Sequence, residues 1–215
     1  MIRSVMFDFG GVITTSPFDA FDRYERRAGL PPGSIRRINS TDPDSNAWAR
    51  LERGDIGLDA FGPLFEREAL ELGLRVDARA VIGALAGEVR PAMVAAVRHC
   101  SERFTTACLT NNFVVAEEEV RADIAEVLAL FDAVFESSKL GVRKPDPEFY
   151  RLACAALGVD PGEVVFLDDL GINLKPARAM GMHTIKVESP EAALGELYAL
   201  VGGPPGGAAS TAGAG

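Results

Sequence analysis

The sequence predicts an α/β fold in which a parallel sheet is covered by helices on both faces. Short apolar runs alternate with helix-length segments along most of the chain, and this alternation is typical of parallel sheets. The later helix-length segments carry apolar residues about 3.6 positions apart, such as Val94, Val97 and Cys100. With 215 residues, the chain is long enough for one core and a smaller inserted domain.

Five apolar runs that border polar clusters are the predicted strands. They span residues 4–7, 105–109, 133–135, 164–167 and 184–187. Parallel sheets bind ligands in the crevice at the carboxyl ends of their strands. Polar residues that follow these runs are therefore the candidates for a functional site.

The segment between the first two strands predicts a helical insert. Roughly ninety residues separate these strands, whereas a crossover connection needs only about 10 to 12. Helical periodicity is clear in 19–28 and 58–72. We predict a Rossmann-like core domain from residues 1–15 and 88–201, with a helical cap domain at 16–87 that covers a site.

The composition limits the partners and the location that we expect for this protein. The formal net charge of −9 disfavours nucleic acid and anionic membrane surfaces as partners. No apolar run reaches the roughly 18 to 20 residues that span a bilayer, and no charged leader precedes the first strand, so we expect a cytoplasmic protein.

The three cysteines are predicted to be buried thiols, and residues 202–215 are predicted to form a disordered tail. The sequence leaves a monomer and a homodimer open.

Asp8 ends the first predicted strand, and a glycine turn follows it. Taken alone, an aspartate at this place would form a turn or cap a helix. Gly10 and Gly11 weaken that interpretation, because glycines adopt positive φ and let backbone N–H groups approach an anion.

Thr110 and Asn111 follow the second strand, and Lys144 precedes Pro145 after the third. The Thr–Asn pair suits a phosphate but also suits a helix N-cap. Pro145 holds Lys144 extended and would aim its charge in a fixed direction, although a solvated surface lysine is the simpler alternative. Asp146 followed by proline predicts the N-cap of the next helix.

Two adjacent carboxylates, Asp168 and Asp169, follow the fourth strand. Such neighbours repel each other unless a cation or hydrogen-bond donors lie between them. Mg²⁺ prefers carboxylate, carbonyl and water oxygens, so it is the natural ion here.

In this order, the four groups resemble the four motifs of the haloacid dehalogenase superfamily. The resemblance runs from Ile2 to about Val201. The stretch from Val165 to Arg178 is similar to a branch that includes the N-terminal phosphatase domain of soluble epoxide hydrolase and the hydrolase domain attached to some acyl-CoA dehydrogenases. The resemblance implies a Rossmann-like core with a helical cap and a Mg²⁺-dependent phosphatase for a small phosphorylated metabolite.

The resemblance also implies a role for each acidic motif. Asp8 would attack phosphorus and form an aspartyl-phosphate. Mg²⁺ would be held by Asp8, the backbone carbonyl of Gly10 and Asp169, with Asp168 as a ligand or as support for one.

The other motifs would bind the phosphoryl group. Thr110 and Asn111 would contact its oxygens, and Lys144 would offset charge on both nucleophile and phosphate. Asn173 would orient the metal-binding carboxylates.

Gly10 departs from the family pattern. Most phosphatases of the superfamily have a second aspartate there as general acid and base, an effect worth roughly 10² to 10⁴ in rate. Some sugar-phosphate phosphatases with an Asp-Leu-Gly-Asn motif also lack this aspartate. A substrate with an activated leaving group would need the acid least, so we expect a substrate of that class. A catalytically weak regulatory domain that binds phosphate is an alternative. A haloacid dehalogenase is a further one, although those enzymes lack the acidic pair.

Trp48, Arg50 and Glu52 lie on one helical stretch of the insert. They could face the site and select the substrate. The simpler interpretation is that Trp48 packs in the insert and that Arg50 and Glu52 are solvated charges.

Overall fold

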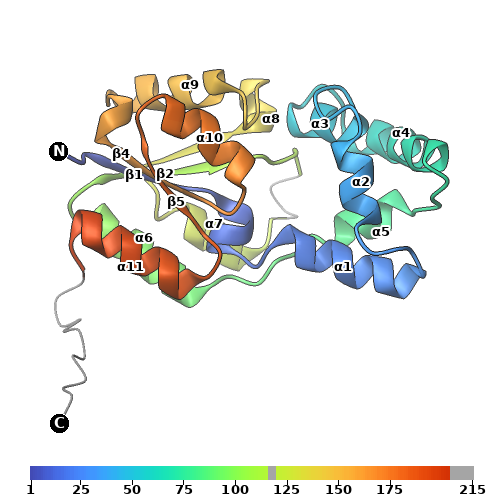
Figure 1. Cartoon of the computed structure of the whole chain (residues 1–215), viewed down its shortest axis with the longest axis horizontal. Coiled ribbons are helices and arrows are strands. Elements are labelled where there is room, and N and C mark those ends of the chain that lie inside the picture. The colour runs from blue at the N-terminus through green and yellow to red at the C-terminus, as the bar shows by residue number, and fades with distance from the viewer. Residues whose placement is uncertain (116–119, 204–215) are drawn as a thin grey trace, which may run out of the picture.

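The computed structural model describes residues 1–115 and 120–203 and has a five-stranded parallel sheet at its centre (Figure 1). The strands are β1 (Ser4–Phe7), β2 (Thr105–Thr110), β3 (Ala133–Glu136), β4 (Val164–Asp168) and β5 (His183–Lys186). Their order is β3–β2–β1–β4–β5. The predicted α/β fold and its five strands are confirmed, and the strand ends differ from the prediction by one residue at most.

Helices cover both faces of this sheet (Figure 1). They are α6 (Pro91–Ser101), α7 (Ala122–Leu128), α8 (Ser137–Leu140), α9 (Pro147–Leu157), α10 (Gly171–Ala179) and α11 (Pro190–Val201). Successive strand side chains point to opposite faces. Met6 therefore packs with Phe149 of α9, whereas its neighbour Phe7 packs with Met93 of α6. Burial on both faces explains why the central strands are largely apolar.

The insert between β1 and α6 is helical, as predicted. Its helices are α1 (Pro17–Ala28), α2 (Ser34–Ser40), α3 (Ala47–Glu52), α4 (Leu58–Glu71) and α5 (Ala78–Gly83), and they lie beside the sheet (Figure 1). They enclose a separate apolar cluster, in which Phe61 stacks on Phe65 with ring centroids 5.0 Å apart. Trp48 packs edge-on against Phe61 at 5.7 Å, so its predicted packing role is confirmed.

The chain leaves the core and returns to it at one place. Thr14 pairs with Val89 in an isolated antiparallel bridge, and the N–H of Thr15 donates to the carbonyl of Glu88 at 2.9 Å. Both connections therefore lie close to the turn that follows β1. The helical insert is thereby attached next to Asp8.

Three smaller predictions also concern the fold. Cys100, Cys108 and Cys154 are buried free thiols, as predicted. Within the described ranges, no helix is both long and apolar enough to cross a membrane. The predicted disordered tail lies almost entirely outside the described residues, which end at Gly203.

Candidate active site

Asp8 lies at the centre of the carboxyl edge of the sheet. β1 is paired with β2 on one side and β4 on the other, and the N–H of Asp8 extends the β4 pairing to the carbonyl of Leu167 at 2.8 Å. The ends of three strands therefore meet around Asp8. This placement brings Thr110, at the end of β2, and the acidic pair after β4 to the same edge.

Lys144 is buried among these strand ends. Its Nζ donates to Asp8 Oδ1, to Asp168 Oδ2 and to the carbonyl of Leu109, each at 2.8 Å. Only 1% of its side chain is exposed, so the simpler interpretation as a solvated surface lysine is wrong. The ammonium uses all three of its donors and fixes the two carboxylates relative to each other.

The buried charges shift one another's pKa values. Burial acts to lower the pKa of Lys144, but the carboxylates of Asp168 and Asp8 outweigh it and raise the pKa. Lys144 therefore stays protonated. Burial is also the main influence on Asp8 and raises its pKa; Lys144 opposes this, and the nearby Asp168 adds to it.

One oxygen of Asp8 remains available. Its Oδ1 accepts both the ammonium of Lys144 and the N–H of Phe9, the latter at 2.6 Å. No hydrogen bond from the described residues reaches Oδ2. This oxygen can therefore bind a cation or attack an electrophile while the other one holds the carboxylate in place.

Asp168 is fully buried and saturated with hydrogen bonds. Beside Lys144, it accepts the N–H of Leu170 at 2.8 Å and the Asn173 amide at 3.1 Å on both oxygens. The backbone carbonyl of Asn173 in turn accepts the hydroxyl of Tyr150 at 2.7 Å. These contacts hold the motif after β4 rigidly at the sheet edge.

Asp169 faces the glycine turn after Asp8. A Cβ on Gly11 would lie 2.2 Å from Asp169 Oδ2, and Gly11 has φ +84°, so only glycine fits this position. Burial, followed by the repulsion of Asp168, raises the pKa of Asp169 to about 6, against the opposing influence of Lys144.

The three carboxylates fit a metal ion. Asp8, Asp168 and Asp169 each offer an oxygen, and these oxygens lie within 4.8 Å of one another. When all three are ionised, Lys144 balances only one of the three charges. A divalent cation would remove the remaining repulsion, which is why hard cations bind such groups.

The side chain of Asn111 makes contacts other than those we expected. Its Oδ1 accepts the backbone N–H of Lys144, and its Nδ2 donates to the backbone carbonyl of Lys144, both at 2.9 Å. The amide therefore supports the lysine. Thr110 is half-buried, and its hydroxyl makes no hydrogen bond within the described part of the chain.

The structure also places two further sequence predictions. Asp146 accepts the N–H of Glu148 at 2.8 Å and Pro147 begins α9, which confirms the predicted helix start. Glu52, expected to be a solvated charge, has 13% of its side chain exposed and forms an ion pair with Arg143 of the core. That expectation was wrong, because a long-range partner buries the carboxylate.

Arg90 is a site residue that sequence reasoning missed. Its Nη1 donates to the carbonyl of Gly11 at 2.8 Å, and its charge acts to lower the pKa of Asp169. Arg90 lies where the insert returns to the core, far from Gly11 in sequence. No local pattern distinguishes it from a surface arginine.

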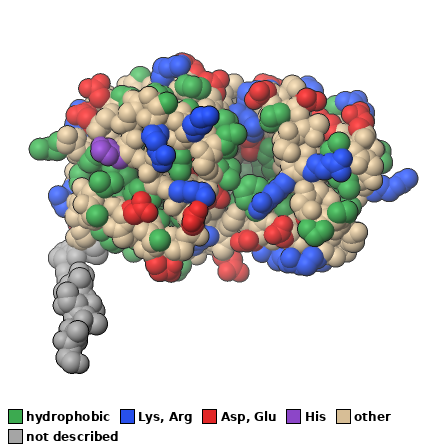
Figure 2. All heavy atoms as spheres, in the orientation of Figure 1, with side chains coloured by type: hydrophobic (Ala, Val, Ile, Leu, Met, Phe, Trp, Pro, Cys, Tyr) green, Lys and Arg blue, Asp and Glu red, His purple; other side chains and the backbone are tan. Residues whose placement is uncertain are grey.

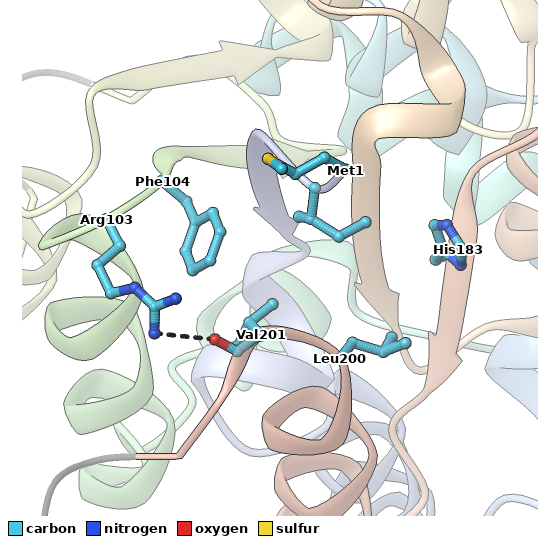
Figure 3. Close-up of a pocket in the computed structure, with 7 residues that line it drawn as sticks. Met1, Arg103, Phe104, His183, Leu200 and Val201 are labelled. Atoms are coloured by element: carbon cyan, nitrogen blue, oxygen red, sulfur yellow. Dashed lines mark hydrogen bonds between the residues drawn. The ribbon is translucent and has the colours of Figure 1, made fainter.

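A shallow cavity elsewhere carries different chemistry. It encloses about 400 Å³ at the amino ends of the strands, opposite Asp8, and Met1, Phe104, His183 and Leu200 are among its lining residues (Figure 3). Arg103 also lines this cavity, and its guanidinium donates to the carbonyl of Val201 at 3.1 Å. No carboxylate lines this cavity. By contrast, acidic and basic side chains gather where the face is hollowed between core and insert (Figure 2).

Comparison with known families agrees with this geometry. The haloacid dehalogenase-like hydrolase family matches residues 2–181. The chain belongs to this family. It is therefore a hydrolase with the haloacid dehalogenase-like fold.

Named relatives of this hydrolase include parts of larger proteins. The chain is 36% identical to acyl-CoA dehydrogenase family member 10 of Mus musculus and 32% identical to bifunctional epoxide hydrolase 2 of Sus scrofa. Each alignment covers 94% of this chain but only 19% and 39% of the relative, so the chain spans well under half of either protein. The predicted resemblance to both is confirmed.

One relative and one solved structure match over most of their length. Phosphatase MT3486 of Mycobacterium tuberculosis is 30% identical, over 87% of this chain and 88% of the relative. A haloacid dehalogenase family enzyme from Bacteroides thetaiotaomicron, solved with magnesium and inorganic phosphate, superposes with a TM-score of 0.61 at 20% identity, over 86% of this chain and 94% of the other.

Replacing Lys144 by Met is expected to destabilise the protein by about 3 to 5 kcal/mol, because it leaves two buried carboxylates without their cation. Urea denaturation at pH 8 without added metal measures this loss. The loss should shrink at pH 5, because burial raises the pKa of Asp8 and the variant lacks the lysine that opposes this rise, so protonation of Asp8 relieves part of the uncompensated charge.

Lys139→Met is the matched control for this variant. Lys139 pairs with Glu136 but has 72% of its side chain exposed, so its loss should cost less than about 1 kcal/mol. Equal effects of the two substitutions would contradict the assigned role of Lys144.

Proposed function

We propose that this hydrolase is a Mg²⁺-dependent phosphatase that forms an aspartyl-phosphate on Asp8. The proposal is carried by one observation. Lys144 holds Asp8 by Oδ1, inside a cluster of three carboxylates, and leaves Oδ2 free. A buried, oriented carboxylate in this setting suits attack on an anionic phosphate better than acid–base work on a neutral substrate.

The reaction would proceed in two displacements. An oxygen of the Asp8 carboxylate attacks phosphorus, a P–O bond forms, and the bond to the leaving oxygen breaks with its electron pair. The leaving oxygen takes a proton from solvent. Water then attacks the phosphorus of the aspartyl-phosphate, which releases inorganic phosphate and regenerates the carboxylate of Asp8.

The residues that would hold Mg²⁺ are Asp8, the Gly10 carbonyl and Asp169. Bound there, the ion would supply charge neutralisation between the anionic nucleophile and the anionic phosphate. Asp168 has its oxygens occupied by Lys144, Leu170 and Asn173, which favours a supporting role over direct ligation.

Lys144 and the end of β2 would orient the phosphoryl group. The ammonium of Lys144 lies on Asp8 and offsets charge as the new P–O bond forms. Thr110 offers an unengaged hydroxyl at the sheet edge. The side chain of Asn111 is engaged by the backbone of Lys144. We therefore propose that the backbone N–H of Asn111, and not its side chain, binds the phosphoryl group.

Named relatives support phosphate chemistry. Phosphatase MT3486 matches this chain over most of both sequences. The Bacteroides enzyme with the same fold is in complex with magnesium and inorganic phosphate. These names describe the activities and ligands of those proteins. For this chain, the cluster of three carboxylates is the observation that supports the same chemistry.

Asp8→Asn is expected to abolish hydrolysis of p-nitrophenyl phosphate, because the amide is a poor nucleophile. The measurement is p-nitrophenolate release with and without Mg²⁺, with far-UV circular dichroism as the test of folding. Removal of Mg²⁺ by chelation should silence the wild type as well.

Other outcomes would point to the competing functions. Phosphate binding without turnover would favour a regulatory domain. Metal-independent halide release from a 2-haloacid would favour a dehalogenase. Turnover that ignores both Asp8→Asn and chelation would contradict the mechanism.

Acid is expected to weaken Mg²⁺ binding, because protons compete for Asp169, whose pKa lies at about 6. About a tenth of Asp169 would be ionised at pH 5, so Mg²⁺ affinity should fall about tenfold from pH 7.5 and stabilisation by excess Mg²⁺ by about 1.4 kcal/mol. Differential scanning fluorimetry across Mg²⁺ concentrations measures both.

The metal-free protein should respond in the opposite sense. Its folded state holds the Asp169 proton more tightly than the unfolded chain does, so this residue's contribution to stability increases as pH falls from about 7 toward 4. A Mg²⁺-induced shift that is equal at pH 5 and pH 7.5 would contradict the assignment of Asp169 as a ligand.

Gly10 leads us to propose a substrate with an activated leaving group, such as an anomeric or acyl phosphate. No carboxylate side chain stands two residues after Asp8, so a poor leaving group lacks the usual proton donor. Gly10 has φ −71°, which any L-residue can adopt. A Cβ there would meet only the side chain of Pro17, at 3.2 Å and 3.6 Å.

Gly10→Asp is therefore expected to fold and to accelerate hydrolysis of simple alkyl phosphates by at least about 10-fold, which is less than the roughly 10² to 10⁴ that an optimally placed general acid supplies. Gly10→Asn has nearly the same shape without the acid and is the matched control. The measurement is kcat/KM for an alkyl and an anomeric phosphate. Equal rates for the two substrates in the wild type would refute the proposed class.

A further inference from the structure

Glu52 joins the helical insert to the core near Lys144. It is the last residue of α3, and its carboxylate accepts donors from both sides. From the core, Arg143 forms an ion pair with Oε2, and the Asn111 amide lies 3.4 Å from the same oxygen. Only 13% of the Glu52 side chain and 18% of the Arg143 side chain are exposed.

Trp48 fixes the other oxygen from the insert. Trp48 lies one helical turn before Glu52 on α3, and its indole N–H donates to Glu52 Oε1 at 2.8 Å. The indole ring packs against Phe21 and Phe61, with ring centroids 5.6 Å and 5.7 Å away. The carboxylate is therefore oriented by the aromatic core of the insert.

The backbone of α3 also lies tightly against the core. The hydroxyl of Ser137 in α8 donates to the carbonyl of Glu52 at 2.5 Å. A Cβ on Gly54 would lie 2.5 Å from the carbonyl oxygen of Ser138, and Gly54 has φ +72°. Arg143 reaches further into the insert and donates to the carbonyl of Pro43 at 3.2 Å.

These contacts lead to the catalytic lysine in two steps. Asn111, which lies against Glu52, bonds both polar groups of the Lys144 backbone. Lys144 in turn bonds Asp8. Arg143 is the residue directly before Lys144. The ion pair with Glu52 therefore holds Arg143, and the side-chain amide of Asn111 holds the backbone of the next residue.

We propose that Glu52 is a positioning residue that places Lys144 against Asp8 when the insert is seated on the core. The inference rests on the proposed phosphatase function of that site. Two arguments connect Glu52 to the activity of the site. The ion pair between Glu52 and Arg143 is largely buried, so losing one partner leaves a desolvated charge. A displacement of about 1 Å at a reacting group can cost roughly 10²-fold in rate.

The first test needs no activity. Trp48 is the only tryptophan of the chain, so its fluorescence reports on the contact with Glu52. Glu52→Gln and Arg143→Met should shift its emission to longer wavelength and increase its quenching by acrylamide. Amide exchange at the Lys144 N–H, followed by NMR, should become at least about fivefold faster in both variants because Asn111 loses its support.

The second test measures turnover of p-nitrophenyl phosphate with Mg²⁺. Each variant should lower kcat about 10-fold with KM changed by less than about 3-fold. The double variant should be no slower than either single one, because both changes break one contact. Arg143→Lys keeps the charge without the planar fork and should retain more activity than Arg143→Met.

Glu148→Gln is the matched control. Glu148 forms an ion pair with Arg151 on α9, with 49% of its side chain exposed, and its loss should change neither exchange at Lys144 nor kcat. An unchanged kcat in Glu52→Gln with a shifted Trp48 emission would overturn the proposal, because Glu52 would then be structural only. If the wild type hydrolyses no phosphate ester, the phosphatase function fails, and unchanged exchange at Lys144 would separately overturn the positioning role.

Discussion

The ammonium of Lys144, buried among carboxylates, is the interaction on which the site depends. A buried charge is costly unless its partners saturate it, and here Asp8, Asp168 and the carbonyl of Leu109 do so. Each partner lies at the carboxyl end of a different strand of the sheet. The parallel order β2–β1–β4 brings these three strand ends side by side, so the site depends on it.

The rest of the site limits how the surplus negative charge is used. Asn173 and the N–H of Leu170 saturate Asp168, so this residue cannot easily rotate toward a ligand. Gly11 has no side chain, which leaves room for Asp169 beside the turn. The free oxygen of Asp8 and the carboxylate of Asp169 thus remain as the groups available to a ligand, close to the place where the insert is attached.

The sequence predicted the elements and the strand-end residues because both depend on local patterns. Apolar runs of three to five residues marked the strands, and the polar residues after them lie together because parallel strands share one edge. The partners of Glu52 and Arg90 could not be predicted in this way. Each pairs with a group that is distant in sequence, so a surface charge and a buried one have the same local signature. The contacts between the Asn111 side chain and the Lys144 backbone were not predicted for the same reason, because the two residues are distant in sequence.

Gly10 and Glu52 together suggest how the reaction and its selectivity are divided. With no acid two residues after Asp8, the core would supply a nucleophile and charge neutralisation but no proton for a poor leaving group. Selection of an activated substrate would then follow from the chemistry of the core, before any contact with the insert is considered. The insert would contribute through Glu52, because seating α3 on α8 also fixes Arg143 and Asn111 around Lys144. As the proposed cap over the site, the insert would couple substrate enclosure to the support of Lys144, because α3 carries Glu52.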